Sequence, residues 1–109
     1  MTVEQFISRS GFKAISLPHP EREISGCYIG DLLSWVMGRC GADELWITIM
    51  SNVNVVAVST LADVASVILA EGVTLDDEVL EVARTKGVNV ISTDLSAYEA
   101  ALAVAALIK

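Results

Sequence analysis

The 109-residue sequence is poor in the residues on which catalytic and metal sites depend: it has one histidine, two cysteines and two prolines. Cys27 and Cys40 lie thirteen positions apart and have no second pair, which excludes a zinc quartet and a CxxC redox motif. The N-terminal residues MTVEQFISRSG contain no apolar signal core. We therefore expect two buried, reduced thiols, no metal, no cofactor and a cytoplasmic location.

Basic residues are scarce as well, since seven Lys and Arg stand against 14 Asp and Glu, for a net charge of −7. The charges balance in residues 1–42, whereas residues 43–109 hold ten acidic and three basic side chains. Such a surface repels phosphate backbones, so we expect no nucleic-acid partner. The longest uncharged stretch, residues 45–62, contains six Ser, Thr and Asn side chains, which argues against a membrane span and predicts a core segment.

The motifs of phosphate and acid–base chemistry are also missing. No glycine is followed by lysine, so the chain has no P-loop to cradle a phosphate. His19 lies between two prolines and would need Glu21 or Glu23 as an orienting partner to act as a base, so we interpret it as a loop histidine. We expect no enzymatic activity.

Two further groups admit a functional and a structural interpretation, and we favour the structural one. Trp35 and Trp46 are suited to stacking on a base, but an amphipathic helix and a core strand carry them, which indicates packing. The second group is suited to binding a metal, but it falls at the start of a predicted helix, where acidic residues complement the helix dipole. It consists of Asp76, Asp77, Glu78 and Glu81.

Hydrophobic residues make up 53% of the chain, and their spacing predicts a series of short elements. A capping box at Thr2–Gln5 opens the first helix, and Gly11 ends it. The elements predicted in this part are a helix over residues 3–9, a strand over 12–17, a rigid loop at 17–20 and a strand over 23–29. Asp31 is the predicted N-cap of the next helix, which Gly38 and Gly41 end and whose predicted buried face consists of Leu32, Leu33, Val36 and Met37.

Residues 45–50 (LWITIM) form the clearest predicted strand, because they are apolar on both faces, as in a parallel sheet covered by helices. The segment after them permits two interpretations. In one, residues 52–58 fold back as a hairpin and a helix follows over 61–71; in the other, a helix over 53–62 precedes a strand over 64–70.

The last third of the chain has clearer signals. An acidic helix begins within residues 74–78 and ends at Gly87, and a strand follows over 88–92. A second capping box, Ser96–Glu99, opens a terminal helix over residues 97–108 that is apolar nearly all round and needs cover on more than one side. The inward-facing residues predicted for the acidic helix are Val79, Leu80, Val82 and Ala83.

Residues 45–102 resemble the DRTGG domain, through the segments LWITIM, ILAEG, TLDDEVLEVARTKGVNVIST and SAYEAA. ISGCYIGD is similar to the strand that precedes this core, so the resemblance spans roughly residues 20–105. The name-giving Asp-Arg-Thr is replaced by Ser51, Asn52 and Val53, and the Gly-Gly by Glu71 and Gly72. Because the chain has no linker or internal repeat, we expect one α/β domain over residues 1–109, a three-layer αβα sandwich with a mostly parallel sheet. The resemblance implies a helix over residues 53–62.

Open α/β sheets bind ligands at the carboxyl ends of their parallel strands, where amide and hydroxyl groups beside helix N-termini hold small neutral or anionic molecules. Alternatively, Asn52, Thr93 and Ser96 only cap helices. The candidate ligand-binding residues are Ser51, Asn52 and Asn54 after one strand, Glu71 after another, and Thr93, Asp94 and Ser96 after the last.

Together these features predict a non-catalytic regulatory or binding module that senses a nucleotide-like metabolite or docks onto a partner enzyme. The apolar terminal helix predicts a homodimer. The layout is also similar to the N-terminal domain of HPr kinase/phosphorylase, so the alternatives are an accessory of an HPr-kinase-like phosphotransfer enzyme and a structural subunit of a larger metabolic complex.

Overall fold

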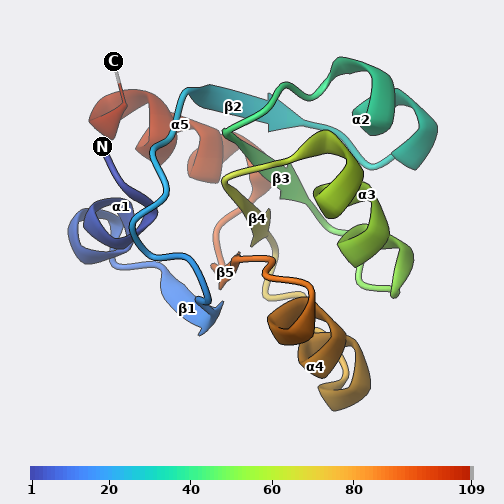
Figure 1. Cartoon of the computed structure of the whole chain (residues 1–109). Coiled ribbons are helices and arrows are strands. Elements are labelled where there is room, and N and C mark those ends of the chain that lie inside the picture. Colours follow the sequence, from blue (N-terminus) through green and yellow to red (C-terminus); the bar gives the residue numbers. More distant parts are fainter. Residues whose placement is uncertain (109) are drawn as a thin grey trace.

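The strands are short apolar segments that lie between two groups of helices, as Figure 1 shows for the computed structural model, which describes residues 1–108. The sheet order is β1-β5-β4-β3-β2, where β1 is Lys13–Ser16, β2 is Gly26–Ile29, β3 is Glu44–Thr48, β4 is Ser66–Leu69 and β5 is Val90–Ser92. The helices are α1 (Val3–Ser10), α2 (Leu33–Arg39), α3 (Asn54–Ala62), α4 (Asp77–Thr85) and α5 (Ala97–Leu107).

Strands β2 to β5 run parallel, whereas β1 pairs antiparallel with β5. Leu45 of β3 lies opposite Ser66 of β4, and α3 is the crossover that joins these two parallel strands. The mostly parallel sheet and the helix within residues 53–62 are therefore confirmed. The hairpin interpretation of residues 52–58 is wrong.

Alternate side chains of the strands enter two separate cores, one on each face of the sheet. Trp46 and Leu69 pack beneath α2, α3 and α4, while Ile47 and Ile68 pack beneath α1 and α5. The β4 strand is buried at all four positions because both of its faces are covered by helices. The predicted three-layer αβα sandwich is confirmed.

The start of α2 differs from the prediction. Its N-cap position is Leu32, without a side-chain capping bond, and the carboxylate of Asp31 instead accepts hydrogen bonds from Thr48 Oγ1 (2.8 Å) and the amide of Ile49 (3.0 Å). The predicted buried face is also wrong in part, since Val36 is buried but Leu32 and Met37 are exposed. A helix of seven residues presents only about one side chain per turn to the sheet, so its apolar flanks remain in solvent.

The packing interpretation holds for Trp46 and is wrong for Trp35. Trp46 is fully buried, and its indole N–H donates to the carbonyl of Gly30 (2.8 Å). Trp35 is 53% exposed and lies beneath the guanidinium of Arg39, whose carbon is 3.8 Å from the ring centre.

The two cysteines are free; Cys40 is buried and Cys27 is only half-buried, which corrects the expectation of two buried thiols. Burial, and secondly the negative charge of Glu44, raises the pKa of each thiol to about 11. Both thiols are therefore protonated at neutral pH and are poor nucleophiles.

The structure contains the capping boxes and the acidic first turn that the sequence predicts. Both predicted capping boxes are present, and α4 begins at Asp77, within the predicted range, with Asp77 and Glu78 in its first turn. Within residues 1–108, no three His, Cys, Asp or Glu side chains are grouped so that they could hold a metal ion. None of the helices described is long and apolar enough to cross a bilayer.

Two polar side chains join distant loops at the amino ends of the parallel strands. Asn89, 2% exposed, accepts from the amide of His19 (2.9 Å) and donates to the carbonyls of His19 (2.8 Å) and Ala65 (3.0 Å). Arg22 donates to Asp43 Oδ1 (2.8 Å), Asp63 Oδ1 (2.8 Å) and the carbonyl of Asp63 (2.6 Å). Sequence reasoning found neither of these two anchors.

Candidate functional site

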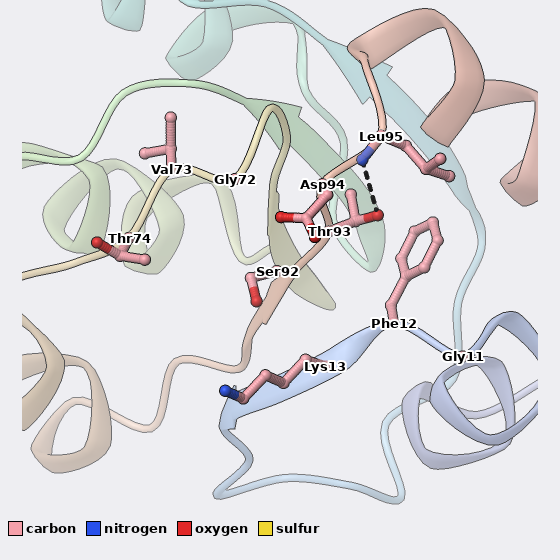
Figure 2. A pocket seen from close by; sticks show the side chains of 10 residues that line it. All are labelled: Gly11, Phe12, Lys13, Gly72, Val73, Thr74, Ser92, Thr93, Asp94 and Leu95. Carbon is pink, nitrogen blue, oxygen red and sulfur yellow. Dashed lines mark hydrogen bonds between the residues drawn. The ribbon is translucent and has the colours of Figure 1, made fainter.

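A groove of about 450 Å³ lies at the carboxyl end of β5 (Figure 2). Three segments form it: the loop that follows β4, the end of β5 with the turn after it, and the start of β1. The lining residues are Gly72, Val73 and Thr74 from the first segment, Ser92, Thr93, Asp94 and Leu95 from the second, and Gly11, Phe12 and Lys13 from the third. A volume of this size suits a small molecule.

The two loops beside the groove hold each other by backbone hydrogen bonds. The amide of Glu71 donates to the carbonyl of Leu95 (2.8 Å), and the amide of Gly72 donates to the carbonyl of Thr93 (3.0 Å). The amide of Leu95 also donates to Thr93 Oγ1 (3.2 Å), the bond drawn dashed in Figure 2. These bonds hold the two loops together on one side of the groove.

Gly72 is required by this geometry. Both Glu71 and Gly72 have left-handed backbone conformations, with φ of 61° and 72°. A Cβ atom at Gly72 would lie 3.1 Å from Asp94 Oδ1, so a larger residue would be strained and would push against a groove side chain.

The groove has one cationic and one anionic side chain, both exposed. Lys13 and Ser92 are direct partners across the β1–β5 pair, so their side chains lie on the same face of the sheet. Among residues 1–108, neither Lys13 nor Asp94 forms an ion pair, and the side chain of neither makes a hydrogen bond. The ammonium and the carboxylate are thus both available to a ligand.

The predicted site residues separate into two groups. Thr93 and Asp94 line the groove, and Glu71 is exposed immediately beside Gly72. Ser96 accepts from the amide of Glu99 (3.1 Å) and so caps α5. Outside the groove lining are Ser51 and Asn52, in the loop before α3, and Asn54, the first residue of α3. Asn52 Oδ1 accepts from the amide of Asn54 (2.9 Å).

Sequence reasoning missed the contribution of β1. Residues 12–17 were expected to form a strand, but no local signal places that strand antiparallel beside β5. Gly11, Phe12 and Lys13 reach the groove only because of this pairing. No histidine or cysteine lines the groove, and His19 is an exposed loop residue whose Nδ1 is 3.7 Å from Glu21 Oε2. Among the residues described, the lining therefore offers hydroxyl, ammonium and carboxylate groups and contains no imidazole or thiol.

Fold and groove define a small α/β module whose polar groove lies at the carboxyl edge of a mostly parallel sheet. The DRTGG domain matches residues 29–107, so the chain belongs to the DRTGG domain family. None of the curated protein sequences matches it.

The fold is similar to a crystal structure of the CBS and DRTGG domains of the regulatory region of Clostridium perfringens pyrophosphatase, complexed with its activator, diadenosine tetraphosphate. The TM-score is 0.73 and 14% of the aligned residues are identical. The match covers 94% of the present chain and 45% of that chain, so the present chain corresponds to less than half of the neighbour's length.

Proposed function

We propose that this chain is a non-catalytic regulatory module that binds a small polar metabolite in the β5 groove. The observation that carries the proposal is a groove whose walls are held by mutual hydrogen bonds and whose charged side chains have no partner within the described residues. Membership of the DRTGG family supports the regulatory role, because the similar pyrophosphatase region is regulatory and has an activator bound. The free thiols support a reducing, cytoplasmic compartment.

A thermal-shift experiment with two glycine variants tests binding in the groove. The probes are ATP, diadenosine tetraphosphate, acetyl phosphate and the common amino acids, each at millimolar concentration. Gly72→Ala and Gly87→Ala both place a side chain at a left-handed position, so each should lower stability by about 1–2 kcal/mol. Only Gly72 lines the groove, and we expect only Gly72→Ala to abolish the ligand-induced rise in melting temperature.

Gly87 is a matched control, because it lies at the end of α4, close to His19 and away from the groove. A probe that stabilises both variants equally binds elsewhere and contradicts the proposal. The absence of a shift with every probe contradicts its ligand-binding part.

We also propose that the module works as a homodimer through the free edge of β2, which ends the sheet order. The other edge, β1, is protected by Lys13 and by a register shift between Ala14 and Ser16, whereas β2 (GCYI) has no charge, proline or bulge. An apolar groove of about 210 Å³ runs between β2 and α5. We call the surface around it the β2–α5 patch, which consists of four lining residues, Ile29, Ala101, Ala105 and Ile108, and of Leu102, the exposed neighbour of Ala101 on α5.

A second copy fits this patch better than a charged partner does. None of its residues is charged, so two chains of net charge −7 can approach here without bringing like charges together. A two-fold axis beside β2 would place the two copies of this strand antiparallel and bring the two α5 helices together, so the same residues would serve both sides.

Leu102→Glu tests the dimer, because Leu102 is 51% exposed on α5 and the substitution would place a carboxylate in the patch. Sedimentation at micromolar concentration should give a dimer for the wild-type chain and a monomer for the variant. Leu61→Glu is the control, since Leu61 is exposed on α3, outside the patch, and this variant should remain dimeric. A monomeric wild-type chain contradicts the proposal.

A further inference from the structure

We infer that the ligand of the β5 groove is a zwitterion of the α-amino acid type, an inference that rests on the proposed function. Lys13 would receive its carboxylate and Asp94 its ammonium group. Figure 2 shows the two side chains reaching the groove from different segments, Lys13 from β1 and Asp94 from the turn after β5.

The first reason for inferring a zwitterion is that Lys13 and Asp94, which have opposite charges, line the same groove without pairing with each other. The two charged groups are not joined by an ion pair in the part of the chain described, so each remains able to bind a group of opposite sign. A molecule that bears an ammonium and a carboxylate on one carbon atom can neutralise both at once, and each contact is a charge-assisted hydrogen bond.

The neighbouring polar groups suit the same ligand. Ser92 lies opposite Lys13 across the strand pair, and Thr74 lines the groove from the loop after β4. Hydroxyl groups both donate and accept hydrogen bonds, so they can serve the carboxylate or the ammonium. The lining contains no second Lys or Arg.

Because Lys13 is the one cationic side chain among the described residues of the lining, a polyphosphate is a poor ligand for this groove. A nucleotide would bring several negative charges to one ammonium, beside the carboxylate of Asp94 and on a chain of net charge −7. A zwitterion has no net charge and escapes this repulsion. The ligand class inferred for this groove therefore differs from the activator in the similar pyrophosphatase region.

Binding measurements on the full chain compare each common L-amino acid with two derivatives, its amide and its N-acetyl form. The amide lacks the carboxylate, and the N-acetyl form lacks the ammonium. At least one amino acid should bind about tenfold more tightly than either derivative, the typical effect of losing one charge-assisted contact.

Two variants test whether Lys13 binds the carboxylate of the ligand and Asp94 binds its ammonium group. Lys13→Met should weaken binding of that amino acid about tenfold but should not weaken binding of its amide, because the amide has no carboxylate for Lys13. Asp94→Asn should weaken binding of the amino acid but should not weaken binding of the N-acetyl form, which has no ammonium for Asp94. Lys86→Met and Glu78→Gln remove exposed charges outside the groove lining and should change nothing.

The outcomes separate this inference from the proposed function. A Gly72-dependent shift with ATP or diadenosine tetraphosphate and none with amino acids would leave the regulatory groove in place and overturn the zwitterion. Equal binding of an amino acid and its derivatives would also overturn it. If no probe binds, both proposals fail together.

Discussion

Replacement of Asn89 by alanine is expected to lower the free energy of unfolding by about 2–4 kcal/mol, because buried polar groups would lose their partners. The side chain is almost completely buried and satisfies the amide and carbonyl of His19 and the carbonyl of Ala65. Alanine can replace none of these bonds, and it leaves a void between the loop of His19 and the sheet. Urea unfolding followed by circular dichroism measures the loss.

Asn54→Ala is the control for this variant, since Asn54 is exposed in the first turn of α3. Its effect should stay within about 0.5 kcal/mol. Similar losses for the two asparagine variants would show that Asn89 does not anchor the loop.

Arg22→Ala should cost about 2 kcal/mol, because one side chain holds two residues that precede neighbouring strands. Arg22 is only 23% exposed, and its guanidinium bonds Asp43 and Asp63, which have left-handed φ values of 66° and 58°. Without the guanidinium, two non-glycine residues remain in a conformation that favours glycine. Both aspartates are at least half exposed, so solvent screening limits the electrostatic part of this cost.

Arg22→Lys should recover less than half of that stability, since a single ammonium cannot reproduce the fork of the guanidinium. Arg84→Ala is the matched control, because Arg84 forms an exposed pair with Glu81 at 3.5 Å and should contribute less than about 0.5 kcal/mol. Equal losses in the two arginine-to-alanine variants, measured by urea unfolding, would contradict the role of Arg22.

Sequence reasoning succeeded where the deciding contacts are local. The capping boxes join residues three positions apart, and both are present. Asp31 was misplaced because its partner Thr48 lies 17 positions away, a contact that only the sheet creates. The anchoring role of Asn89 was not predicted for the same reason, because its partner His19 is 70 positions away.

The competition between hairpin and helix in residues 52–58 shows the limit of local propensity. Val-rich composition favours a strand, yet Val55, Val56 and Val58 form the buried side of α3. Packing against the sheet outweighs the weak preference of β-branched residues, and the family resemblance predicted this outcome where composition did not.

The groove lies at the sheet edge where the sequence predicted a site, and only some of its lining residues were among those predicted. Thr93 and Asp94 follow a strand directly, so the rule for parallel sheets could find them. Lys13 could not be found in this way, because it begins an antiparallel strand whose position depends on the whole fold.

The family match begins at residue 29, whereas β1 and one side of the groove come from residues 11–16. A protein trimmed to the matched segment would keep β3, β4 and β5 but lose α1, β1 with Lys13, and all of β2 except Ile29. Truncation at a homology boundary would therefore leave β3 and β5 as unpaired sheet edges, prone to aggregate, and would remove three of the ten residues that line the groove.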